Sequence, residues 1–210
     1  MKKVLPLLLL AFVMCQCNFQ PSQNQSGKKS LRDQYPEKFT SDYIGERASD
    51  LAEKLCNCDP YNVYAFNNVF TTEYGDLLKQ ALALPQGIDG DGPSSGLWIE
   101  FAGELCSVLA ITDVKVTDDK AKVLMDSEAY DTDELAMKFV DGEWMIDDLG
   151  NCSKQWLKNM IKDSRKYYES INWLNLIHEL EERGYSKEDA VEASDGLRQE
   201  IEEYFENYPK

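Results

Sequence analysis

The chain has 210 residues and a formal net charge of −16. This length can bury one well-packed core, and eleven Tyr and four Trp supply large apolar anchors, so the composition argues against a disordered protein. So acidic a chain is unsuited to nucleic acid, because phosphates are held by Lys and Arg. The negative charge is expected to keep the protein soluble. Three kinds of partner stay possible: a membrane to which an attached lipid anchors the chain, a small ligand, and a protein, in particular a basic one.

The first seventeen residues have the pattern of an export signal. Lys2 and Lys3 precede an apolar run that ends at Cys15 and Cys17. The run has about eleven residues, whereas a spanning helix needs about twenty, so a processed signal is predicted rather than a membrane helix. Cleavage before Cys17, or before Cys15, would leave a cysteine for lipid attachment, with an ordinary secretory signal as the alternative. We therefore expect an outer-membrane lipoprotein facing the periplasm or the surface.

Four cysteines remain if Cys17 carries the lipid. Export permits disulfides, so these four are predicted to form two bonds. A bond between Cys56 and Cys58 would close a strained ring, so each is expected to pair with Cys106 or Cys152, in an order that the sequence leaves open. A zinc clip at Cys56 and Cys58 is the alternative, disfavoured by their spacing and by the oxidising compartment. No metal and no cofactor are expected.

Turn chemistry and apolar periodicity predict α+β architecture. Residues 18–40 are rich in Gln, Ser, Asn and Lys near their start and are expected to form a flexible tether. Apolar residues recur every three or four positions in two later stretches, which predicts helices at 41–58, capped by Ser41, and within 62–84. A Gly-rich loop at 85–96 is followed by β segments, namely a strand at 97–101 and hairpins at 108–116/121–125 and 134–140/143–149.

The second hairpin carries the sharpest turn signal, since Asp141-Gly142 separates two alternating runs. After it, Ser153 and Ser186 are predicted to cap helices, and Gly184 is expected to end the helix between them. These features place a C-terminal helical extension at the end of the chain.

Residues 140–149, Val-Asp-Gly-Glu-Trp-Met-Ile-Asp-Asp-Leu, resemble the closing hairpin of the lipoprotein domain-of-unknown-function family typified by YbjP. The hairpin at 111–116 and 121–123 fits the same family, and the resemblance covers about residues 45–165. It implies a nuclear-transport-factor-like cone: N-terminal helices packed on a curved antiparallel sheet around a central pocket. The family has no assigned activity, so the resemblance implies no function. The expected organisation is a signal peptide (1–17), a tether (18–40), the cone-shaped domain (41–168) and the extension (169–210).

Two kinds of candidate site follow. Asp147 and Asp148 could supply a general base in a cone pocket, although strand neighbours face opposite ways and either acid can instead end the strand or cap a helix. The sole histidine, His178, lies in the extension, so no acid-base pair is apparent. A ligand pocket lined by aromatic side chains is the other candidate, with core packing as its alternative; its residues are Tyr64, Phe66, Trp98, Phe101 and Trp144.

The sequence therefore predicts an exported, lipid-anchored module that binds a small ligand or a protein without catalysis. An immunity-type inhibitor of an envelope-acting toxin enzyme is the first alternative. A cone-fold enzyme that uses Asp147 or Asp148 is the second.

Overall fold

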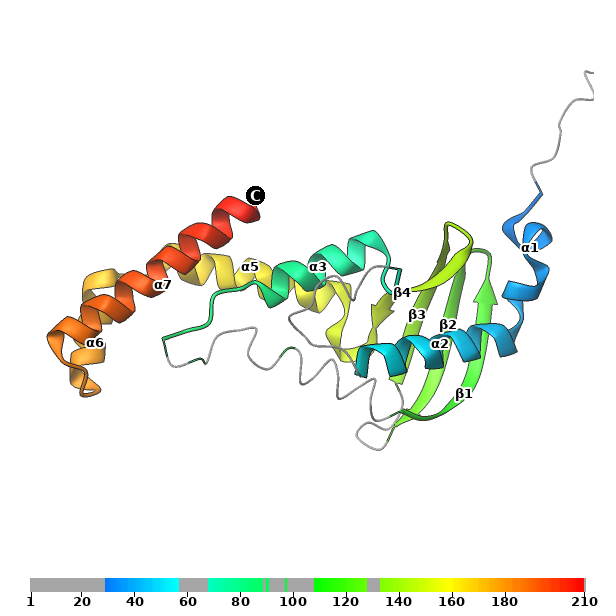
Figure 1. The fold of residues 1–210 in the computed structure, drawn as a ribbon, viewed down its shortest axis with the longest axis horizontal. Helices are drawn as coiled ribbons and strands as arrows, with labels where there is room; N and C mark the ends of the chain where they lie inside the picture. The colour runs from blue at the N-terminus through cyan, green and yellow to red at the C-terminus, as the bar shows by residue number, and fades with distance from the viewer. Residues whose placement is uncertain are drawn as a thin grey trace, which may run out of the picture.

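The computed structural model describes residues 29–56, 68–88, 90, 97, 108–127 and 133–209. These residues form an α+β structure in which helices pack on a curved antiparallel sheet, as the sequence predicted (Figure 1). The elements are α1 (Leu31–Gln34), η1 (Pro36–Phe39), α2 (Ser41–Cys56), α3 (Thr72–Leu82), β1 (Val108–Thr117), β2 (Lys120–Ser127), β3 (Asp133–Val140), β4 (Glu143–Leu149), η3 (Gly150–Cys152), α5 (Lys154–Ser170), α6 (Trp173–Glu182) and α7 (Lys187–Asn207).

The four strands pair in the order β1-β2-β3-β4, so each is joined to the next by a local connection. Both predicted hairpins are confirmed. Asp141 and Gly142 turn the second one with φ of 50° and 86°, the backbone that an Asp-Gly turn favours. The outer edge of β4 is covered by residues 69–71, because Thr71 N donates to Ile146 O and Ile146 N donates to Val69 O, each at 2.8 Å.

Helix α2 crosses one face of the sheet (Figure 1). Its side chains at three- and four-residue spacing are buried there: Ile44, Ala48, Leu51, Ala52 and Leu55. The helix is capped one residue earlier than predicted, since the Thr40 hydroxyl accepts from Tyr43 N at 3.2 Å and Ser41 is already helical.

Part of the predicted tether is helical. Ser30 and Asp33 form a capping box on α1, and η1 places Phe39 in the core with 3% of its surface exposed. The Phe39 ring lies 4.8 Å from that of Phe139 and 5.1 Å from that of Trp144. Burial of one aromatic side chain therefore attaches residues 31–39 to the sheet, which a polar composition did not reveal.

Of the predicted strand at 97–101, the structure describes only Leu97, and this residue is not in a strand. Leu97 is helical and 2% exposed. A short apolar run has no period that separates a buried strand from a buried helix, which explains the difference at Leu97, and residues 98–101 lie outside the described residues.

Helices α5, α6 and α7 form an arm at the end of the molecule opposite α1 (Figure 1). Their predicted caps are confirmed: Ser153 accepts from Trp156 N, Ser186 accepts from Asp189 N, and Gly184 follows α6 with φ of 99°. Helix α5 packs against α3, and α7 packs against α6.

Candidate functional site

The two carboxylates predicted as candidate bases are both engaged in structural contacts. One oxygen of Asp147 accepts from Thr71 Oγ1 and from Lys154 Nζ, each at 2.8 Å. Lys154 also donates to Glu73 at 3.1 Å. Burial opposes the charge on Lys154, but the hydrogen bonds to Asp147 and Glu73 outweigh it and raise the pKa of this ammonium group.

Asp148 caps the start of α5. Its Oδ1 accepts from Lys154 N at 2.9 Å and from its own neighbour, Leu149 N, at 3.0 Å. Both of these hydrogen bonds fix the Asp148 carboxylate at the start of the helix, where it satisfies a backbone donor that the helix itself cannot pair. The capping alternative raised from the sequence therefore describes Asp148 well.

Trp144, one of the five predicted pocket residues, lies in the core. Its side chain is fully buried, and its Nε1 donates to the carbonyl of Lys38 at 2.7 Å. Its ring is surrounded by Phe39 and Phe139. The other four, Tyr64, Phe66, Trp98 and Phe101, lie outside the described residues, so the aromatic pocket stays a prediction.

The cysteines and the histidine give no site among the described residues. Cys56, the last residue of α2, is disulfide-bonded, and Cys152 is buried in η3, while Cys58 and Cys106 lie outside the described part of the chain. The disulfide pairing stays a prediction. No group of three His, Cys, Asp or Glu side chains that could hold a metal ion occurs in the described residues. His178 lies on the exposed side of α6, within 3.5 Å of Glu182.

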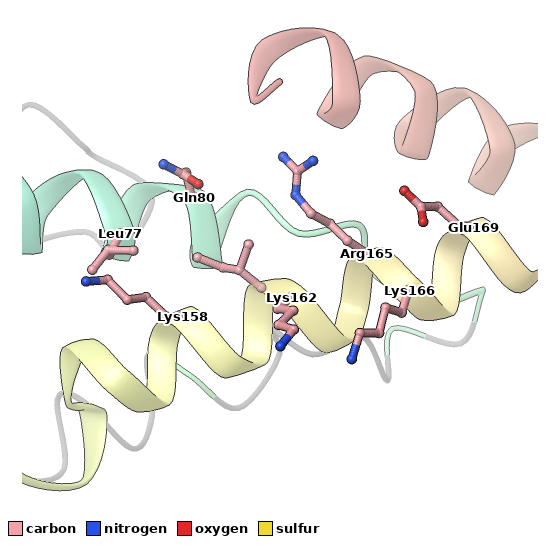
Figure 2. Close-up of a pocket in the computed structure, with 8 residues that line it drawn as sticks. Leu77, Gln80, Lys158, Lys162, Arg165, Lys166 and Glu169 are labelled. Carbon is pink, nitrogen blue, oxygen red and sulfur yellow. The ribbon is translucent and has the colours of Figure 1, made fainter. Parts of the chain in front are cut away.

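A groove between α3 and α5 collects most of the cationic side chains of α5. It has a volume of about 420 Å³, and two of its lining residues come from α3 and six from α5 (Figure 2). The lining consists of Leu77, Gln80, Lys158, Ile161, Lys162, Arg165, Lys166 and Glu169. Four of these eight side chains are cationic and one is acidic, in a protein whose net charge is −16.

Helical spacing explains why the cations gather on one side of α5. Lys158, Lys162 and Lys166 follow one another at four-residue intervals, and side chains four residues apart lie on the same face of a helix. Figure 2 shows Arg165 and Glu169 extending toward α7, while the ends of the Lys162 and Lys166 side chains point in the opposite direction. A bound anion in the groove would therefore have cationic groups on both of its sides.

The cations differ in how far they are already neutralised. Lys158 donates to Glu73 at 3.0 Å and Lys166 to Asp163 at 3.2 Å. Hydrogen bonds from Lys158 and Lys154 hold the pKa of Glu73 below its usual value. Within the described residues, Lys162 has no ion-pair partner, so its charge is the most available to a ligand.

Arg165 joins the groove to the C-terminal helix. Its guanidinium donates to the carbonyl of Tyr208 and lies 5.2 Å from the ring centroid of Tyr204 and 5.3 Å from that of Phe205. These contacts hold the guanidinium in a defined position beside α7, at the edge of the groove that Arg165 helps to line. Arg165 is therefore an ordered donor, unlike the exposed lysines.

This groove was not predicted from the sequence. One signal was present: five basic residues against two acidic ones in residues 154–170 of an otherwise acidic chain, with three lysines at helical spacing. The approach of α3, more than seventy residues earlier in the chain, could not be read from that pattern.

Comparison with protein-family models, with curated proteins and with solved structures finds no match to this chain. Among the described helices, none is both long and apolar enough to cross a membrane.

Proposed function

We propose that this protein is an exported, lipid-anchored binding module without catalytic activity, and that the α3–α5 groove is its site for an anionic ligand. The observation that carries this proposal is the concentration of four cationic side chains around one 420 Å³ groove in a chain of net charge −16. Like charges repel when clustered, so such a group is costly unless anions balance it. Glu73, Asp163 and Glu169 supply only part of that balance.

The state of the two candidate bases supports a non-catalytic role. Asp147 is bound by Thr71 and Lys154, and Asp148 by the start of α5. A general base needs a free lone pair directed at a substrate proton, and the bonded oxygens of both carboxylates are directed at protein donors. Export and lipid attachment rest on the signal pattern at 1–17 and on Cys17 or Cys15.

Native mass spectrometry tests the binding role. The chain purified from a cell-envelope extract is expected to carry an anionic molecule in addition to its own mass. The variant Lys162→Glu/Lys166→Glu should lose that molecule, because two cations at the groove become anions. The control Lys120→Glu/Lys187→Glu changes the net charge equally at exposed positions on β2 and α7 and should keep it. Equal retention in both variants, or no bound molecule at all, would contradict the proposed site.

An immunity-type inhibitor is the second candidate, and the surface of α7 favours it. This helix carries eight acidic residues against Lys187 and Arg198, and Leu174 on the neighbouring α6 is 79% exposed. An acidic surface beside an exposed apolar side chain suits a basic protein partner. Salt-sensitive inhibition of a basic envelope enzyme by the purified chain would support this role, and inhibition unchanged by charge reversal on α7 would argue against it.

A further inference from the structure

We propose that the ligand of the α3–α5 groove is a monomeric single-chain amphiphile with a carboxylate or phosphate head. This inference rests on the proposed binding role of the groove and adds the chemical class of the ligand. It follows from the apolar side chains that line the groove, the cations around them, and the volume of the groove and its length along α5.

The apolar strip comes from both helices. Leu77 on α3 is half-buried and Ile161 on α5 is 7% exposed, and both line the groove. The lysine side chains beside them carry four-carbon stems that cover apolar surface while their ammonium groups stay in water. A ligand that carried charge alone would leave the exposed part of Leu77 and the lysine stems in contact with water, whereas an alkyl chain would cover them.

The head group would meet cations of two kinds. Lys162, which has no ion-pair partner within the described residues, and Lys166 supply mobile point charges. Arg165 supplies planar N–H donors from a side chain already held by Tyr208 and the rings of Tyr204 and Phe205. Carboxylate and phosphate oxygens are the partners that such a set of donors binds best.

The shape of the groove favours a slender ligand over a protein segment. The lining on α5 runs from Lys158 to Glu169, which is roughly 17 Å of helix at 1.5 Å per residue. Its volume lies in the range of small-molecule sites, about 300–1,000 Å³. A bound helix would need a continuous series of apolar anchors at helical spacing, and among the described lining residues only Leu77 and Ile161 are aliphatic.

The flanking charge favours a soluble ligand over a bilayer surface. Helix α7 packs beside α5 and carries Glu200, Glu202, Glu203 and Glu206 over its last two turns. These acids are exposed, and they would repel an anionic membrane surface that approached the groove from that side. A single molecule can enter the groove without bringing such a surface close to α7.

Isothermal titration calorimetry tests the ligand class on the full chain carrying Cys15→Ser and Cys17→Ser, which removes the predicted lipid. Dodecyl phosphate below its micelle concentration is expected to bind with one-to-one stoichiometry, and octyl phosphate more weakly. Inorganic phosphate and dodecyl maltoside, which carry only the head charge or only the chain, should each bind at least about tenfold more weakly, or ~1.4 kcal/mol. Lys162→Glu/Lys166→Glu should weaken dodecyl phosphate by a similar factor, and Lys120→Glu/Lys187→Glu should leave it within about twofold.

Each other outcome overturns the inference in a distinguishable way. Equal affinity for dodecyl phosphate and inorganic phosphate would leave an anion site, and hence the proposed function, but would remove the amphiphile. Equal affinity for dodecyl maltoside and dodecyl phosphate would show that the charge of the head group does not contribute to binding. Binding to phosphatidylglycerol vesicles but not to monomeric dodecyl phosphate would assign the groove to a membrane surface. No binding to any of these probes, together with an empty chain in native mass spectrometry, would overturn the proposed function itself.

Discussion

Lys154 Nζ lies 2.8 Å from Oδ1 of Asp147, and that contact joins the sheet to the helical arm. Asp147 belongs to β4, and Lys154 is the first residue of α5. Thr71, which precedes α3, donates to the same oxygen. The half-buried carboxylate of Asp147 therefore links β4, α5 and the segment before α3. Asp147, which the sequence suggested as a catalytic base, stabilises the packing of these three segments.

Replacement of Asp147 should therefore weaken folding. The side chains of Asp147 and Lys154 are 22% and 17% exposed, between the cases of a surface pair and a buried pair. We expect Asp147→Ala to lower the free energy of unfolding by about 1–2 kcal/mol, since Thr71 and Lys154 lose a shared acceptor. Urea unfolding followed by circular dichroism measures this change.

The matched control for that experiment is Glu134→Ala, which removes the surface pair with Lys122. These side chains are 43% and 61% exposed, so the expected loss is at most about 0.5 kcal/mol. Equal losses in the two variants would contradict the structural role of Asp147.

The contact between η1 and the β3–β4 turn should make stability depend on pH. Glu143 accepts from Lys38 at 3.0 Å and from Tyr43 at 2.9 Å. Burial alone would raise the pKa of Glu143, but these bonds outweigh it and hold the pKa below its usual value. Its contribution is therefore fully present above the unfolded pKa, about 4.3, and is lost as the pH falls through the lower folded pKa.

Urea midpoints measured from pH 7 down to pH 3 test that dependence. Glu143→Gln should lower stability at pH 7 and should flatten the acid-induced decrease relative to the unmodified chain. Glu134→Gln is the control at an exposed pair. If the urea midpoint fell with the same slope in the unmodified chain and in Glu143→Gln, Glu143 would not be the source of the pH dependence.

The sequence predicted those parts of the fold that depend on local chemistry. The second hairpin followed from Asp141-Gly142 between alternating runs, and the arm from Ser153, Ser186 and Gly184. Each of these signals acts within about four residues. By contrast, the helices over 31–39 depend on Phe39, whose partners Phe139 and Trp144 lie about a hundred residues away.

The candidate groove was hidden for the same physical reason. The lysine spacing on α5 was visible in the sequence, but a groove also needs the opposite wall, which Leu77 and Gln80 supply from α3. Likewise, the sequence did not show that Asp147 is bonded to Thr71, because Thr71 lies 76 residues before Asp147 in the chain. Pairing at this distance is set by the packing of the whole domain.

A buried tyrosine offers a second test of the junction near η3. Tyr74 on α3 is fully buried, and its hydroxyl donates to the carbonyl of Cys152 at 2.8 Å. Tyr74→Phe keeps the ring and removes the donor, which leaves that carbonyl without this bond, so a loss of about 1–2 kcal/mol is expected. Tyr167→Phe, at a side chain that is 60% exposed, should change the unfolding free energy by less than about 0.5 kcal/mol. A comparable effect at both positions in urea titrations would refute the prediction.

Two glycines should respond in opposite directions to the same substitution. Gly142 has φ of 86° in the β3–β4 turn, where an L side chain is strained, so Gly142→Ala should cost about 1 kcal/mol or more. Gly196 lies within α7, and a Cβ there would meet no atom within 4 Å. Gly196→Ala should therefore stabilise the chain by about 0.5–1 kcal/mol, because alanine loses less backbone entropy in a helix. Thermal and urea unfolding of both variants measure the pair, and a gain at Gly142 or a loss at Gly196 would contradict the backbone assigned to that residue.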